Sequence, residues 1–295
     1  MSKTPLNRPV DFPAPARAGA VLAEDDELQV LLEPPFAAAW DRAEPAPAGS
    51  ATLHARLMAR TAATRAAEAE MVTQRRRLLP RHPVAAGATA QTLYEPTPGR
   101  PARPGEPRRV RLLELAPGAT LQPHEWCPAD AQAHQRELLV LAGTVQLDEQ
   151  TLSLRDYQLL PPGVPAPTVH APEGALLFVR EAEPTEDHGT APLTVLDAEA
   201  GWPDFAPGIQ RRVLSQHRGQ ASMLYLAQPG AQVPRHTHGH DEECLMVQGE
   251  LFLDDLLLQP GDYQLAPAGT GHRITETDTG VVIYAHGDLD LQFVA

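Results

Sequence analysis

The sequence predicts a mainly β protein with two tandem copies of one domain, preceded by a small helical segment. Proline and glycine are frequent, with 31 and 21 residues in a chain of 295, and this favours short strands joined by turns. From residue 93 onward, short apolar runs alternate with Gly, Pro and Asp, as in a sandwich or barrel. An internal repeat indicates that the β-domain occurs twice.

The N-terminal part has a different composition. Residues 1–20 are rich in Pro and Ala, and we expect them to form a disordered lead. Residues 21–85 are expected to be a helical segment with a linker. The clearest helix follows Ser50, a suitable N-cap, and has Leu53, Leu57 and Met58 at helical spacing.

The repeat defines the domain organisation of the rest of the chain. Residues 137–163 align without gaps with residues 243–269, including the letters DYQL and a following Pro-x-Gly, and residues 115–124 align with residues 227–236. We therefore expect one domain at residues 90–183 and a second at residues 194–295. The acidic, proline-containing stretch between them has the composition of a linker.

Four side chains of the second copy predict a metal site. His236 and His238 are two residues apart, so in a strand they point to the same face. Glu242 follows a turn and can add an anionic oxygen, and His272 enters from a distant strand. Three imidazoles and one carboxylate suit one divalent ion per chain, such as Zn, Fe, Mn, Ni or Cu.

The spacing of these residues resembles the two signature motifs of the cupin family. The first motif, G-x5-H-x-H-x3-E-x6-G, and the second, G-x5-P-x-G-x2-H, are met by Gly230, His236, His238, Glu242 and Gly249, and by Gly261, Pro267, Gly269 and His272. The resemblance implies two cupin domains of the jelly-roll, or double-stranded β-helix, type. It selects Glu242 as the ligand over Asp241 and Glu243, which we expect at the surface or behind the ligands.

Three further residues near the motif are assigned other roles. His240 falls in the turn between His238 and Glu242, so we expect it to be exposed, with an accessory ligand role as the alternative. Cys244 is expected to be a buried thiol. The stretch between Gly249 and Gly261 is shorter than in most cupins, which implies tight hairpins at residues 147–151 and 253–257.

The first copy keeps the turns of the motif but loses most of its ligands. His124 corresponds to His236, whereas Trp126, Arg136 and Ala166 replace the other three ligands. We therefore expect residues 90–183 to form a degenerate cupin domain without a metal site. His134 and His170 lie near the lost positions and are the only candidates to compensate.

The domain order resembles ChrR-type cupin anti-sigma factors. In that group an N-terminal helical domain binds a sigma factor and a C-terminal cupin binds zinc, so the resemblance implies zinc at His236, His238, Glu242 and His272, with iron, manganese and nickel as alternatives. Residues 39–67 look like the linker of this group. Residues 1–90 depart from the pattern, because they contain no cysteine and only His54 and His82, so zinc cannot hold this segment together as it does in the family.

Composition excludes several classes of function. The net charge of −14 disfavours a nucleic-acid-binding surface. Neither a secretory leader nor an apolar stretch long enough to span a membrane is seen in the sequence, so we expect a cytoplasmic protein without membrane contact. Cys127 and Cys244 are far apart, and neither belongs to a C-x2-C pair.

Three functions remain open. The first is a regulatory or sensor protein that contacts a sigma factor, or another protein, through its N-terminal helices. The second is a metal-dependent enzyme, such as a dioxygenase or isomerase, with Tyr225, Gln264 and Tyr284 as the polar side chains near the site by sequence. In the third, the metal only braces the fold. The two copies are expected either to pack within one chain or to leave strand edges that form a homodimer.

Overall fold

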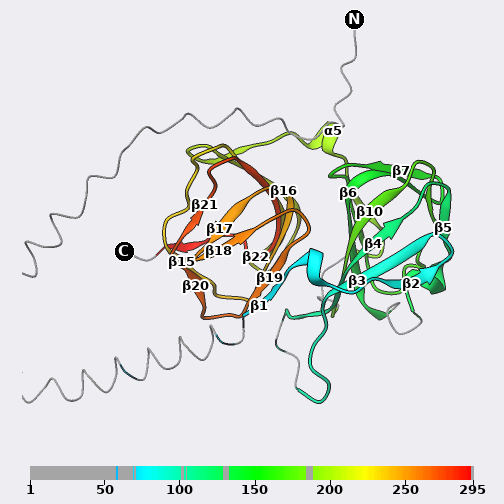
Figure 1. Cartoon of the computed structure of the whole chain (residues 1–295), viewed down its shortest axis with the longest axis horizontal. Helices are drawn as coiled ribbons and strands as arrows, with labels where there is room; N and C mark the ends of the chain where they lie inside the picture. The colour runs from blue at the N-terminus through cyan, green and yellow to red at the C-terminus, as the bar shows by residue number, and fades with distance from the viewer. Residues whose placement is uncertain are drawn as a thin grey trace, which may run out of the picture. The chain divides into compact units, whose positions relative to one another are not determined.

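The computed structural model describes Met58, Ala69 and residues 71–100, 103, 105–128, 133–183 and 189–293. Met58 and Ala69 are helical, whereas the rest of the predicted helical segment before residue 71, and the predicted lead, lie outside the described residues. The described chain is mainly β, as predicted, and forms two β-units (Figure 1). None of its described helices has the length and apolar character needed to cross a membrane.

The first β-unit contains ten described strands, one of which, β11 (Leu193–Val195), comes from a later part of the chain, and a short helix. Its main sheet has the strand order β11-β8-β6-β10-β4-β3-β2, with β5, β7 and β9 attached beside this path. Its elements are β2 (His82–Ala85), β3 (Ala88–Tyr94), β4 (Pro107–Leu115), β5 (Ala119–Leu121), α4 (Pro123–Trp126), β6 (Gln135–Leu147), β7 (Gln150–Ser153), β8 (Tyr157–Leu160), β9 (Val169–Ala171) and β10 (Ala175–Ala182).

The second β-unit repeats this arrangement. Its main sheet has the order β1-β19-β16-β22-β14-β13-β12, and two small sheets have the orders β20-β15-β23 and β18-β17-β21. Its elements are α5 (Asp197–Ala200), β12 (Asp204–Ala206), β13 (Ile209–His217), β14 (Gln220–Ala227), β15 (His236–Thr237), β16 (Glu242–Gly249), β17 (Leu251–Leu253), β18 (Leu256–Leu258), β19 (Tyr263–Ala266), β20 (Gly271–His272), β21 (Thr275–Glu276), β22 (Val281–Asp288) and β23 (Gln292–Phe293).

Two short strands are exchanged between the units. β1 (Val72–Gln74) precedes the first unit in the chain but pairs with β19 of the second. β11 (Leu193–Val195) precedes the second unit but pairs with β8 of the first. The two strands meet equivalent partners, because Gln74 lies opposite Tyr263 and Val195 lies opposite Tyr157, the tyrosines of the two DYQL sequences.

The exchange corrects the predicted boundaries. Residues 72–85 fall in the part of the chain expected to be a helical segment with a linker, yet they contain β1, the 3-10 turn η1 (Arg76–Leu78) and β2. Pro80 and Pro83 interrupt any helix there, and the free edge of β19 supplies a partner for an extended chain. The first unit therefore begins before residue 90, and residues 194–195 extend the sheet of the first unit rather than that of the second.

The central strands are apolar on both faces because each face meets a different core. On β6, Leu138 and Val140 point into the core of the first unit. Leu139 and Leu141, the residues next to them, belong to a cluster that includes Leu245, Tyr263 and Tyr284 of the second unit. The two copies thus pack against each other within one chain, one of the two arrangements expected from the sequence.

Candidate metal centre

The four predicted ligands come together on one side of the second unit. His236 lies in β15, His272 lies in β20, and the two residues are directly opposite each other in the antiparallel pairing of these strands. Glu242 begins β16. The histidines at 236, 238 and 272 are each 3% exposed, so the alternation seen in the sequence turns His236 and His238 to the same interior face.

The distances fit a single coordination centre. Nitrogen atoms of His236 and His238 and a carboxylate oxygen of Glu242 all lie within 4.8 Å of one another. His272 Nε2 is 4.0 Å from Glu242 Oε2, and the His272 ring centroid is 5.1 Å from that of His238 and 5.7 Å from that of His236. All four predicted side chains therefore converge.

Each histidine is oriented by a contact through Nδ1. His236 Nδ1 is 3.0 Å from the Pro234 carbonyl oxygen, and His272 Nδ1 is 3.1 Å from Asp254 Oδ2. His238 Nδ1 is 2.9 Å from Glu242 Oε2. For His236 and His272 such contacts fix the ring orientation and leave Nε2 for a metal, the arrangement typical of histidine ligands. His238 differs, because its Nδ1 faces a fellow ligand.

Asp254 is the functional residue that sequence reasoning missed. It lies in the turn between β17 and β18, with φ +52°, and its Oδ1 accepts hydrogen bonds from the backbone N–H groups of Arg273 and Ile274. Its carboxylate therefore holds both the His272 ring and the backbone that follows it. The hairpin at residues 253–257 was predicted, but the spacing of the motif residues did not indicate that its aspartate contacts His272.

Charge interactions keep the carboxylate of Glu242 ionised. Burial opposes ionisation, but His238, His272 and His236 outweigh it and lower the pKa of Glu242 to about 2. Burial also lowers the pKa of His236, and Glu242 offsets this only in part. For His238 the effect of Glu242 exceeds that of burial, so its pKa is raised.

A buried atom without a partner tests whether a metal fits this centre. His238 Nε2 is buried and has no hydrogen-bond partner among the described residues. An unpaired buried nitrogen is costly, and a metal ion bound at Nε2 would satisfy it. The donor set of three imidazoles and one carboxylate also matches a borderline divalent metal, so the residues fit the group that the cupin motifs imply.

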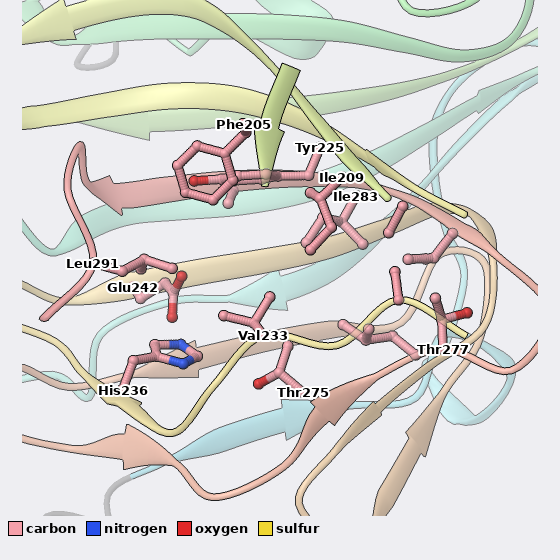
Figure 2. A pocket seen from close by; sticks show the side chains of 15 residues that line it. Phe205, Ile209, Tyr225, Val233, His236, Glu242, Thr275, Thr277, Ile283 and Leu291 are labelled. Carbon is pink, nitrogen blue, oxygen red and sulfur yellow. The ribbon is translucent and has the colours of Figure 1, made fainter. Parts of the chain in front are cut away.

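An apolar cavity lies next to the ligands. His236 and Glu242 form part of its wall, together with Phe205, Tyr225 and Ile283. Figure 2 shows His236 and Glu242 at one end, with aliphatic side chains extending away from them.

Of the three polar residues proposed near the site, only Tyr225 lines this cavity. The Gln264 side chain donates a hydrogen bond to Thr73 of the exchanged strand β1. The Tyr284 hydroxyl donates to Glu137 of the first unit. Tyr284 belongs to the contact between the units, whereas Gln264 lies opposite Cys244 and so shares the face of the sheet that carries Glu242, although it does not line the cavity.

Among four neighbours of the ligands, His240 and Cys244 agree with the expectation and Asp241 and Glu243 differ from it. His240 is not part of the converging group; its side chain is 41% exposed and its Nδ1 contacts Asp288. Asp241 is buried and receives Arg103 Nε at 2.8 Å and the Ala268 N–H at 2.9 Å. Glu243 is buried against Arg180 of the first unit, so a surface position for either acid is wrong. Cys244 is a buried free thiol, as predicted.

The first unit fills the corresponding space with two large side chains. Trp126 and Arg136, which replace the second histidine and the glutamate, are both 0% exposed. Trp126 Nε1 donates to the Pro167 carbonyl oxygen at 3.0 Å, and Arg136 Nη1 lies 3.1 Å from Cys127 Sγ. His124, the one retained ligand residue, is exposed on α4.

The fold and the site define a class: a two-unit jelly-roll protein with a histidine- and carboxylate-lined centre in its second unit. Comparisons with known proteins agree. Residues 190–290 match the family model described as the ChrR cupin-like domain. The second β-unit is therefore similar to a ChrR cupin-like domain, and the described chain has the cupin fold.

Solved structures similar to the chain share its fold at low sequence identity. One is YlbA from E. coli, with 17% identity, 74% of this chain and 90% of that chain covered, and a TM-score of 0.56. Another is a candidate dioxygenase from Nostoc punctiforme, with 17% identity, 77% and 81% coverage, and a TM-score of 0.53. A third is the oxalate decarboxylase of Bacillus subtilis, a protein with Mn(II) centres, with 16% identity, 74% and 77% coverage, and a TM-score of 0.53. The curated proteins contain no match to the chain.

Proposed function

We propose that the protein is a regulatory metal-binding cupin related to ChrR-type anti-sigma factors. The second unit would bind one divalent ion, zinc in the first place, and the N-terminal segment would contact a sigma factor. The match of residues 190–290 to the ChrR cupin-like domain supports this proposal. It covers the unit that contains His236, His238, Glu242 and His272.

The observation that carries the proposal is the position of β1. This strand follows the N-terminal segment directly and pairs with β19, where Val72 lies opposite Leu265. β19 also pairs with β16, and there Ala266 lies opposite Glu242. The end of the N-terminal segment is therefore joined to the sheet that positions a metal ligand, which is the connection that a sensor requires.

Two groups of residues would have different roles at the metal centre. His236, His238, Glu242 and His272 would hold the ion, and Asp254 and the Pro234 carbonyl would keep two of the imidazoles oriented. A bound divalent ion would supply a Lewis-acid centre for a small ligand. Glu242 stays ionised near neutral pH and offsets part of the positive charge.

Co-purification of the full chain with sigma factors tests this function. Each sigma factor of the host would be mixed with metal-loaded chain, with chain treated with a chelator, and with the His238→Gln variant. We expect one sigma factor to bind, with an affinity that differs between the metal-loaded and metal-free chain, and His238→Gln to behave like the metal-free form. Asp255→Asn serves as the control, since the Asp255 side chain is 89% exposed. Recovery of no sigma factor, or equal binding with and without metal, contradicts the proposal.

The apolar cavity favours a second candidate, a metal-dependent enzyme of the dioxygenase or isomerase type. A pocket beside a metal centre is the usual place for a small substrate. Purification of the chain with tightly bound iron, together with oxygen uptake on a panel of small substrates, would support an enzyme. Tightly held zinc without turnover would argue against it.

A further inference from the structure

The cavity beside the metal centre is small. Its volume is about 60 Å³. A single water needs about 10–15 Å³ by this measure. The space therefore suits a molecule with a few non-hydrogen atoms beyond the group that faces the metal ligands.

The walls of the cavity are mostly aliphatic and aromatic. Several strands contribute to them, with Ile209 on β13, Ala227 on β14, Leu251 on β17 and Ile283 on β22. In Figure 2 the aliphatic side chains extend from the end with His236 and Glu242 toward Thr277. A ligand that reaches the metal centre would thus place the rest of its body against apolar surface.

The ionisable groups in the cavity wall that could face a metal, His236 and Glu242, lie at one end. Among the described residues that line it there is no lysine or arginine. Burial raises the pKa of Tyr225 to about 12, so its hydroxyl is neutral near pH 7. Arg211 does not line the cavity but lies next to two residues that do: it is the cross-strand partner of Tyr225, and its guanidinium stacks on the ring of Phe205 at 4.4 Å and donates to the Leu289 carbonyl oxygen.

The end with His236 and Glu242 is where an anionic head would bind. A divalent ion bound there would exceed the single negative charge of Glu242, and a carboxylate or enolate of a ligand would offset the remaining positive charge. A second anionic group would enter the apolar part of the cavity without a partner, and an unpaired buried charge is strongly unfavourable.

We propose that the cavity binds a small monoanion with one oxygen-donor head and one short apolar tail, of the class of short aliphatic monocarboxylates, and discriminates against dicarboxylates. The head faces His236 and Glu242, and the tail contacts Ile209, Ile283 and Leu251. This inference rests on the proposed metal-binding function and names the class of ligand for the same site.

Binding of matched carboxylates to the metal-loaded full chain tests the inference. Titration calorimetry would compare acetate, propionate, butyrate and succinate after the metal content has been measured. We expect affinity to rise about fourfold with each added methylene from acetate to butyrate. Succinate, which has as many carbons as butyrate but two charges, is expected to bind no more tightly than acetate.

Two variants that change the cavity volume in opposite directions distinguish binding of the apolar tail from binding at the metal centre. Ala231→Leu adds volume to the wall and should abolish the gain from acetate to butyrate, whereas Ile283→Ala enlarges the cavity and should shift the preference to a longer acid. Both should retain the metal. Succinate binding as tightly as butyrate, or affinity independent of tail length in the wild type, overturns the inference. A chain that binds no divalent metal would instead contradict the proposed function.

Discussion

The three histidines at the centre of the second unit are equivalent in the sequence but differ in how they are held. His236 is oriented by a backbone carbonyl, His238 by the carboxylate of a fellow ligand, and His272 by Asp254. The ligand identities could be predicted because strand alternation and motif spacing are local properties. The orienting groups could not, because they depend on which loops meet in space.

Replacement of Asp254 by asparagine should weaken metal binding. The change removes the charge that holds His272 Nδ1, although an amide can keep the backbone contacts to residues 273 and 274. Loss of such an orienting partner typically lowers metal affinity about 10- to 100-fold. Competition against a chromophoric chelator measures the change.

Asp255→Asn is the matched control for this variant. The Asp255 side chain is adjacent in sequence, 89% exposed and paired only loosely with Arg273 at 3.3 Å. We expect its metal affinity to equal that of the wild type. Equal affinities for both variants would show that Asp254 does not position the ligand.

At the scale of the elements, the glycine that ends β16 explains one position of the first motif. Gly249 has φ +76°, and a Cβ atom there would lie 2.0 Å from the Gly280 carbonyl oxygen. Gly143, its counterpart in the first copy, is equally close to the Gly174 carbonyl oxygen, at 2.1 Å. The motif glycine thus permits close approach of two backbones, which is why the degenerate copy retains it without the metal ligands.

Alanine at Gly249 should destabilise the protein more than alanine at Gly269. Both glycines have positive φ, so both substitutions incur backbone strain, but nothing lies within 4 Å of a Cβ at Gly269. The forced movement at Gly249 should add about 1–3 kcal/mol to the loss of unfolding free energy. Urea unfolding measures both variants, and equal losses would mean that close approach is unimportant at Gly249.

The strand exchange marks the limit of prediction at this scale. The strands β6, β10 and β16 were recognised because each contains four or five consecutive apolar residues. β1 and β11 have three residues each, too few for a period to be seen, and they become strands because an edge of the other unit is free to pair. The sequence pattern within β1 or β11 contains no information about a pairing strand that is distant in the chain.

At the scale of the whole molecule, a buried charge network joins the two units. Arg180 of the first unit contacts Glu137 at 2.9 Å and Glu243 of the second unit at 2.7 Å. Tyr157 and Tyr263 each donate a hydrogen bond at 2.9 Å to the nearer of these glutamates. In the sequence these charges stand at the ends of apolar runs and look exposed; only the packing of one copy on the other buries them.

Glu137 gives the network a predictable pH dependence. Burial raises the pKa of this carboxyl group, but Arg180, His286 and hydrogen bonds from Ser222 and Tyr284 outweigh burial and lower it from 4.5 to about 2. A lowered folded-state pKa stabilises the protein above pH 4.5, and this contribution is lost as pH falls from 4.5 to about 2. A shift of this size corresponds to about 3 kcal/mol.

The Glu137→Gln variant should therefore show a flatter loss of stability in acid. Unfolding free energy would be measured by urea between pH 6 and 2 for the wild type, for Glu137→Gln and for Glu183→Gln, whose side chain is 57% exposed. We expect Glu183→Gln to follow the wild-type slope. A Glu137→Gln slope as steep as that of the wild type would indicate that this carboxylate is not ionised in the folded network.

The most direct test of the account is the number and position of metal ions in the full chain. Metal analysis of protein purified without chelators, read with an anomalous-difference map, should give one divalent ion per chain, bound by His236, His238, Glu242 and His272. The first unit, with Trp126 and Arg136 in the corresponding space, should contain none. Two ions per chain, an ion held elsewhere, or no ion after incubation with divalent metals would contradict the account.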